Sequence, residues 1–224
     1  MKSLQTVATE VSNCRDCPRL VEWRETVAQE KRAAFRADAY WGRGVPGFGD
    51  PDARVLVVGL APAAHGANRT GRMFTGDRSG DWLYRAMHKA GLANQSESVS
   101  ASDGLELRGA WVTSIVKCAP PDNKPLPAER DNCRRHLVAE LSALEQVRAV
   151  VCLGSFSYDN ACREFAVSKK PKFGHGVEVL GAMPDGRQVH IICSFHPSQQ
   201  NTFTGKLTEP MIDAVFARAR QLTN

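Results

Sequence analysis

One stretch of the chain, residues 55–77, decides the fold and reads VLVVGLAPAAHGANRTGRMFTGD. It opens with a short continuous apolar run, Val55 to Leu60, which is typical of a β-strand covered on both faces. The remainder is rich in glycine and other small residues, so its backbone can approach a ligand closely. The stretch therefore predicts a buried strand that leads directly into a binding loop.

Further buried strands alternate with helices on the carboxyl side of this stretch. Strands are predicted at 110–116, 149–154 and 189–195, and helices at 80–90, 127–144, 160–165 and 208–222. Pro127 in the first turn and Glu129 just inside it are typical of a helix start. Strands separated by helices predict an α/β fold, a three-layer α/β/α sandwich around a central, mainly parallel four-stranded sheet.

The size and composition of the chain limit the classes of protein to which it can belong. It has 224 residues, of which 42% are hydrophobic and 24% are charged, as in a globular protein with one domain over residues 1–224. The 29 Lys and Arg residues exceed the 24 Asp and Glu residues, and the net charge of +5 permits a polyanionic partner. No apolar run approaches the ~20 residues that span a bilayer, and the N-terminus lacks an apolar signal core. We therefore expect a soluble, cytoplasmic protein.

The seven cysteines fall into two groups. In a reducing compartment they are not expected to form a disulfide framework. Cys14 and Cys17 form a C-x-x-C pair ahead of a helical pattern at 20–35, and Cys118 and Cys133 lie fifteen positions apart. Four such thiolates can hold a zinc ion or an iron–sulfur cluster, and the wide spacing of the second pair favours the cluster without excluding zinc. The other three lie in apolar contexts typical of core thiols: Cys152, Cys162 and Cys193.

Three loops rich in polar and small residues follow predicted strands, at 61–77, 117–125 and 196–206. Each of them alone is more often only a loop, and a histidine beside a strand, such as His196, is more often structural than catalytic. The carboxyl ends of parallel strands meet at one edge of a sheet, however, so the three loops are expected to converge on one site.

The loops and the cysteines carry a resemblance to a known family. Residues 59–77 resemble the first motif of the family 5 (type B) uracil-DNA glycosylases, and HPSQQNTFTG at 196–205 resembles their second active-site motif. KCAPP at 117–121 is similar to the cluster-ligand segment between the two motifs. The resemblance extends from Cys14 to about Lys206. It implies the α/β/α sandwich of the uracil-DNA glycosylase superfamily, with a 4Fe–4S cluster held by Cys14, Cys17, Cys118 and Cys133.

The resemblance also implies an activity. Such enzymes extrude a damaged base from DNA, hydrolyse its N-glycosidic bond and thereby initiate base excision repair. Uracil and other deaminated bases such as hypoxanthine are the expected substrates, in double- or single-stranded DNA, with the protein acting as a monomer. Phe74 matches the phenylalanine that stacks on the base, and His196 matches the histidine that donates a hydrogen bond to uracil O2.

Several positions depart from the pattern of related enzymes. Ala61 stands where family 4 enzymes have a carboxylate, and a methyl group cannot activate water. Asn68 replaces an acidic residue of family 4 and of some family 5 relatives, so it either holds the attacking water or is a turn residue with a left-handed backbone. Ser114 aligns with a base-reading asparagine of family 4, which favours a broad substrate range. His65 in the first motif and Asn123, a turn or substrate residue, complete the predicted base-binding set.

Basic and amide side chains are expected to contact the DNA. The predicted contacts are Arg69, Arg72 and Lys206 to phosphates, with a basic loop at 169–176 as a further candidate. Gln199, Gln200 and Asn201 follow His196 and are suited to fill the gap left by an extruded base, and Ser198 is a further expected DNA contact. The alternative is a catalytically silent iron–sulfur DNA-binding module of the same fold, against which Phe74 and His196 argue.

Overall fold

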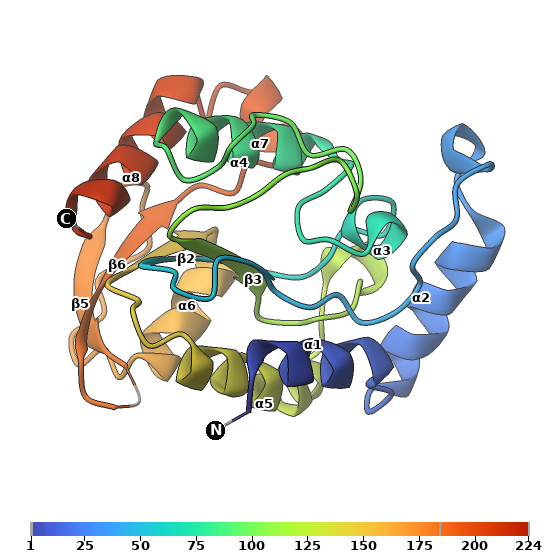
Figure 1. Ribbon diagram of the computed structural model, residues 1–224, viewed down its shortest axis with the longest axis horizontal. Helices are drawn as coiled ribbons and strands as arrows, with labels where there is room; N and C mark the ends of the chain where they lie inside the picture. Colours follow the sequence, from blue (N-terminus) through green and yellow to red (C-terminus); the bar gives the residue numbers. More distant parts are fainter. Residues whose placement is uncertain (1, 184, 224) are drawn as a thin grey trace.

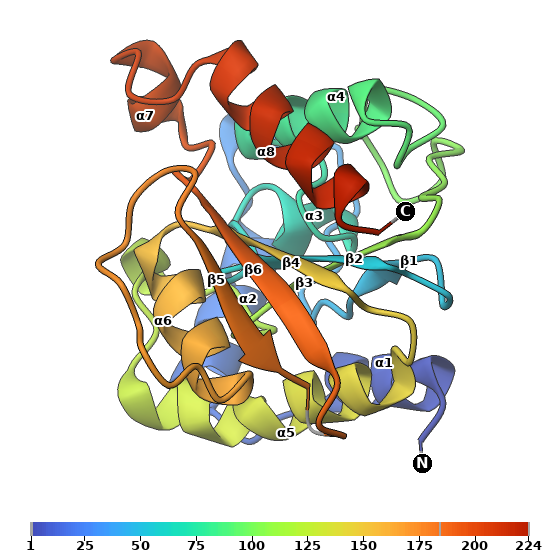
Figure 2. The ribbon, with the colours of Figure 1, turned by 90° about the vertical axis from the view of Figure 1, so that its left-hand side faces the viewer.

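The computed structural model describes residues 2–183 and 185–223 and has helices on both faces of a central sheet (Figures 1 and 2). The strands are β1 (Phe48–Gly49), β2 (Val55–Gly59), β3 (Ala110–Ser114), β4 (Ala149–Leu153), β5 (Glu178–Ala182) and β6 (Gln188–Ser194). The helices are α1 (Leu4–Asn13), α2 (Pro18–Glu30), α3 (Ala67–Thr70), α4 (Arg78–Lys89), α5 (Pro127–Ala143), α6 (Ser155–Glu164), α7 (Gln199–Phe203) and α8 (Glu209–Gln221), with short 3-10 turns at Ala33–Phe35 and Pro121–Asn123. The predicted α/β/α sandwich is confirmed.

The centre of the sheet consists of the four predicted strands, which run parallel in the order β3-β2-β4-β6. Every residue of β2, β3 and β4 is buried. Such strands have no polar face, which explains why continuous apolar runs, rather than alternating patterns, revealed them in the sequence.

The predicted number of four strands is wrong, because the sheet has six. The two additional strands, β1 and β5, pair antiparallel at its two edges. β1 spans only two residues, and β5 is partly exposed along its whole length. Edge strands of this kind need no continuous apolar run, so the signal that identified the buried strands was absent.

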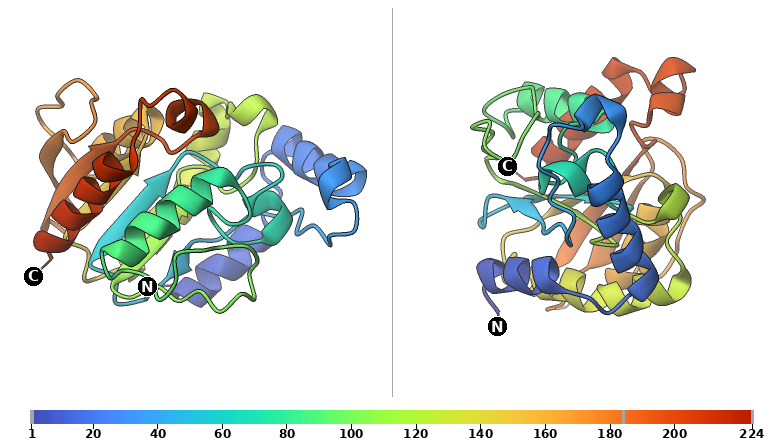
Figure 3. Two further views of the ribbon diagram at one scale, coloured as in Figure 1. Left: turned by 90° about the horizontal axis from the view of Figure 1, so that it is seen from above. Right: turned by 90° about the vertical axis from the view of Figure 1, so that its right-hand side faces the viewer.

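Two hydrophobic layers cover the two faces of the sheet. Side chains of α4 and α8 pack on one face with those of β2, β3 and β4. Side chains of α5 and α6 pack on the other face. The N-terminal segment lies along this second side, where α1 packs against α5, and α2 runs beside α3 (Figure 3). Within the described residues, no helix combines the length and the apolar character required to cross a membrane.

The four parallel strands end at the same edge of the sheet. Gly59 at the end of β2 pairs with Ser114 of β3, and Leu153 at the end of β4 pairs with Ser194 of β6. The segments that follow these strands therefore leave the sheet side by side. This edge is where an open parallel sheet places its ligand.

Candidate active site at the carboxyl edge of the sheet

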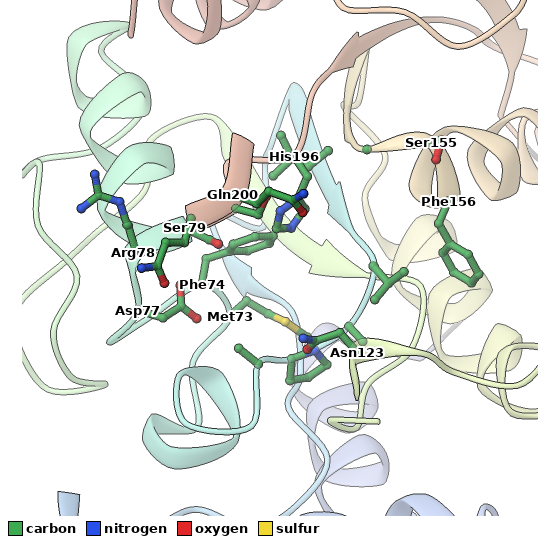
Figure 4. A pocket seen from close by; sticks show the side chains of 18 residues that line it. Met73, Phe74, Asp77, Arg78, Ser79, Asn123, Ser155, Phe156, His196 and Gln200 are labelled. Carbon is green, nitrogen blue, oxygen red and sulfur yellow. The ribbon is translucent and has the colours of Figure 1, made fainter. Parts of the chain in front are cut away.

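A cavity of about 560 Å³ opens at this edge (Figure 4). Its volume lies within the range of small-molecule sites. The segments that follow β2, β4 and β6 line it, and Asn123 from the segment after β3 completes the wall. The predicted convergence of the three loops is confirmed. The lining includes Ala61, Phe74, Asn123, His196, Ser198, Gln199 and Gln200 from the predicted set.

Phe74 is held firmly at the cavity wall. Its backbone is left-handed, with φ of 51°, which is uncommon for a bulky residue. The ring packs directly on Gly59, where a Cβ atom would lie 2.6 Å from Phe74 Cζ. The Tyr84 hydroxyl donates to the carbonyl of Met73 at 2.7 Å and fixes the preceding peptide. Strained backbone that persists under such constraints is typical of functional sites.

His196 stands next to Phe74, with 6.2 Å between the ring centroids and 36° between the ring planes. Gly154 lies beside His196 and has φ of 92°, a backbone conformation that favours glycine. The side-chain amide of Asn201 donates to the His196 carbonyl at 2.8 Å and fixes the backbone. Burial lowers the pKa of His196 to about 4, so the imidazole is neutral at physiological pH. Within the described part of the chain, no residue forms a hydrogen bond with this ring, which leaves both nitrogens available to a ligand.

Helix α7 forms one rim of the cavity. Ser198 caps it by accepting a hydrogen bond from the Asn201 backbone N–H at 3.3 Å. Gln199 and Gln200 are exposed and line the cavity mouth. Lys206 follows on an exposed loop, with its ammonium 5.1 Å from the centroid of the Phe195 ring. Polar groups on an accessible rim suit the predicted contacts with DNA.

Two residues at this rim were missed because no sequence pattern predicted them. Phe203 is 65% exposed at the end of α7, and the Arg78 guanidinium lies 4.5 Å from its ring centroid. Arg78 also lines the cavity. A five-residue helix is too short for a hydrophobic periodicity, so nothing in the sequence distinguished Phe203 from a core aromatic.

Asp77 is a third residue that was missed. It is the only carboxylate among the described residues that line the cavity. Its side chain caps α4 by accepting a hydrogen bond from the Gly80 backbone N–H at 3.0 Å. Burial raises the pKa of this carboxyl group. An aspartate directly ahead of a predicted helix is a visible capping signal, but that signal says nothing of a cavity.

Asn68 and Ser114 do not reach the cavity surface. The Asn68 side chain is fully buried, and its amide donates to the Arg24 carbonyl at 3.2 Å. Its backbone belongs to α3 and is not left-handed, so the alternative of a left-handed turn residue is wrong, and the water-holding role stays a prediction. Ser114 is also buried, and its hydroxyl donates to the Val116 carbonyl at 2.8 Å. Asn123, by contrast, combines a left-handed turn backbone with a place in the cavity wall.

Three polar residues of the first motif have protein partners instead of facing the cavity. Arg72 is buried and forms an ion pair of 2.6 Å with Asp103. Arg69 forms an ion pair of 2.6 Å with Asp38. His65 places Nδ1 3.1 Å from a tyrosine hydroxyl, and loss of hydration lowers its pKa. These partners come from distant parts of the chain, so the sequence could not indicate them.

The four cysteines of the predicted ligand set line one small second cavity. They come from the end of α1, the start of α2, the segment after β3, and α5, which are brought together by the packing of α1 on α5. In the described chain, no three His, Cys, Asp or Glu side chains are arranged to hold a single metal ion. The other three cysteines are buried elsewhere in the core, as predicted.

Nitrogen donors surround these four sulfur atoms. Each Sγ accepts one hydrogen bond: Arg24 Nη1 to Cys118 at 2.9 Å, Lys117 N to Cys133 at 3.2 Å, Asn132 Nδ2 to Cys17 at 3.7 Å, and Arg135 Nη2 to Cys14 at 3.7 Å. His136 lines the same cavity, and its Nε2 is buried without a partner among the described residues. A ring of donors around thiol sulfurs suits a negatively charged, sulfur-ligated group.

Comparison with known proteins agrees with this geometry. The family model described as "Uracil DNA glycosylase superfamily" matches residues 46–220. The "Type-5 uracil-DNA glycosylase" of Mycobacterium bovis is 54% identical over 216 residues, which cover 95% of this chain and 79% of the relative. That of Thermus thermophilus is 49% identical over 210 residues, covering 93% of each chain. The "Type-4 uracil-DNA glycosylase" of Archaeoglobus fulgidus is 28% identical over 203 residues, covering 88% and 83%. The chain thus belongs to the uracil-DNA glycosylase superfamily and, within it, to the type-5 enzymes.

Proposed function

We propose that this protein removes uracil from DNA by hydrolysing the N-glycosidic bond of a base that has been flipped into the 560 Å³ cavity. One observation carries the proposal: the ring of Phe74 and a neutral His196 lie side by side in the cavity wall, 6.2 Å apart. An aromatic face and a free hydrogen-bond donor are what a flipped pyrimidine requires. The names of the type-5 relatives support the same activity.

His196 stabilises the departing base in this mechanism. Cleavage of the base–sugar bond leaves positive charge on the sugar and negative charge on uracil, mainly at O2. A fixed donor aimed at that oxygen stabilises the transition state more than the ground state. Burial keeps the imidazole neutral. The neutral ring stabilises the oxygen by donating a hydrogen bond from its N–H, and it keeps its proton.

Neither Ala61 nor Asn68, the two positions where related enzymes carry an acidic residue, supplies a base for the attacking water, and the carboxylate of Asp77 caps α4. Ala61 lines the cavity with a methyl group, and the amide of Asn68 is engaged with the Arg24 carbonyl. We therefore propose a dissociative reaction in which the phosphates of the DNA stabilise the sugar cation. The assignment of the water to Asn68 stays a prediction, since it requires the amide to leave its present partner.

We further propose that the cavity accepts hypoxanthine as well as uracil, and that excision initiates base excision repair. Ser114 is buried and its hydroxyl is engaged with the Val116 carbonyl, so it is not available to select one base edge. Asn123, Gln199 and Gln200 are exposed and lie at the cavity wall and mouth, where they can adapt to different bases. Lys206, Gln199 and Ser198 would contact the DNA backbone on either side of the flipped nucleotide.

The cysteine cavity would hold a 4Fe–4S cluster ligated by Cys14, Cys17, Cys118 and Cys133. The donors around the four sulfur atoms support this assignment. When bound, such a cluster would supply a covalent cross-link between the N-terminal segment and the sheet. Its role would be structural, because hydrolysis needs no electron transfer. The whole chain would act as one domain and as a monomer in the cytoplasm.

A single-turnover excision assay tests the proposal. Duplexes with one uracil, one hypoxanthine or only undamaged bases are incubated with excess protein, treated with alkali and resolved on a gel. We expect strand breaks at uracil and at hypoxanthine and none in the undamaged duplex. Binding of the uracil duplex without any break would instead support the catalytically silent DNA-binding module. Breaks at uracil alone would retain the glycosylase and reject the broad substrate range.

A further inference from the structure

Arg24 is a buried cation that forms no ion pair with a carboxylate among residues 2–183 and 185–223. It lies on α2, is 1% exposed and is the largest fully buried side chain of the described residues. Nη1 donates to Cys118 Sγ at 2.9 Å, and Nη2 donates to the Cys14 carbonyl at 3.0 Å. Its Nε is buried without a partner in the described part of the chain. The hydrogen bonds of the guanidinium therefore go to two of the four cysteines that line the cysteine cavity.

Other buried cations of this protein differ from Arg24. Arg72 pairs with Asp103 at 2.6 Å, and Lys117 pairs with Glu140 at 2.7 Å. A buried charge without a counter-charge costs several kcal/mol, so native proteins almost always pair it. The Cys118 sulfur is the acceptor that the structure offers to Arg24, and a cysteine sulfur that ligates a metal carries negative charge.

We propose that Arg24 is the charge partner of the sulfur ligands and, through them, of the cluster assigned to this cavity under the proposed function. The guanidinium offsets the negative charge that four thiolates bring into a buried site. Its donation to Cys118 also orients that ligand, as hydrogen bonds to first ligands commonly do. Arg24 is thus a positioning residue and does not touch the flipped base.

The same residue joins the cysteine cavity to the first motif. The Arg24 carbonyl accepts the hydrogen bond of the Asn68 amide, and Asn68 lies in α3, between β2 and Phe74. The guanidinium of Arg24 is therefore held by the cysteine segments, and its backbone carbonyl is held by the first motif. This arrangement gives the buried Asn68 side chain its hydrogen-bond partner.

Two consequences follow for the cluster. A positive charge beside a ligand stabilises the reduced cluster more than the oxidised one, so its removal shifts the reduction potential to more negative values. Loss of the hydrogen bond to the ligand also weakens retention of the metal, and such outer partners typically change metal affinity by about 10- to 100-fold. The shift of the reduction potential distinguishes a charge partner of the cluster from a residue that only packs beside it.

The test compares Arg24→Gln with Arg15→Gln in the purified holoprotein. Arg15 is the matched control, because it is next to Cys14 in the sequence but has an exposed side chain that pairs with Glu25 instead of a cysteine sulfur. The measurements are iron and sulfide per chain, the rate of iron loss to a chelator, and the reduction potential. We expect Arg24→Gln to lose iron about 10- to 100-fold faster, with a more negative potential. Arg15→Gln should stay within about twofold of the wild type, since exposed charges are screened.

Each outcome decides between the two proposals. Wild-type protein without iron and sulfide rejects the cluster itself, and the role of Arg24 falls with it. Iron and sulfide in the wild type, with an unchanged rate and potential in Arg24→Gln or with equal shifts in both variants, overturns only the role of Arg24. Where Arg24→Gln is insoluble, Arg24→Lys decides, because it keeps the charge. Retention of iron supports the proposal, whereas an insoluble or iron-free Arg24→Lys overturns it.

Discussion

Two cavities of this protein differ in how their functional groups are paired. The cavity at the sheet edge measures about 560 Å³ and presents the imidazole of His196, which has no hydrogen-bond partner among the described residues. The cysteine cavity is small, and each of its four cysteine sulfur atoms already accepts a hydrogen bond. The first arrangement suits a ligand that enters and leaves, and the second suits a group that stays.

The largest expected effect is at the cysteine cavity. Serine at Cys14, Cys17, Cys118 or Cys133 should abolish iron binding and reduce the soluble yield, because ligation is coupled to folding. Iron analysis and the visible absorption of the purified protein measure this. Cys162→Ser is the matched control, since Cys162 is buried in the core away from this cavity and should keep the iron. Loss of iron in the control, with retention in any of the four, would refute the ligand assignment.

The next largest effect is expected for His196→Ala. Loss of one donor to a developing oxyanion typically slows the chemical step by about 100- to 1000-fold. The loss should be largest for uracil and smaller for hypoxanthine, where no exocyclic oxygen occupies the place of O2. Single-turnover rates on both bases, measured beside DNA affinity, test this. Equal losses on both bases that track a loss of DNA affinity would show that His196 only supports the loop.

A smaller effect is expected for Phe74→Ala. Removal of the ring should weaken capture of the base by ~1–3 kcal/mol, the usual scale of base–aromatic stacking. Because stacking does not depend on base identity, every accepted base should be affected alike. Excision rates at subsaturating protein measure the loss, and iron content should not change. Wild-type rates on all bases would place the functional surface of the cavity elsewhere.

The excision rate should be almost independent of pH in the range where histidines usually titrate. Burial lowers the pKa of His196 from 6.5 to about 4, so the neutral donor is already fully populated above about pH 5. Activity carried by the neutral form is lost only as the pH falls toward the lowered pKa. Single-turnover rates from about pH 5 to pH 8 should therefore be flat. A decline centred near pH 6.5 would indicate a solvated histidine.

Sequence patterns predicted the fold better than the details of the site. The apolar runs at 55–60, 110–116, 149–154 and 189–195 identified all four central strands, and only the partly exposed edge strands were missed. Among the site residues, Phe74 and His196 lie at the cavity, whereas Asn68 and Arg72 are buried against partners of their own.

The sequence by itself determined which segments are buried and which chemical groups the chain carries. Burial of a strand depends on its own apolar residues, and the spacing of the cysteines is a property of the chain. The tertiary structure alone decided the direction of each polar side chain and the partner of each charge. Arg24 and Cys118 are 94 positions apart in the sequence, yet Arg24 Nη1 lies 2.9 Å from Cys118 Sγ in the fold. Such pairings depend on how distant elements pack, which no local pattern of residues encodes.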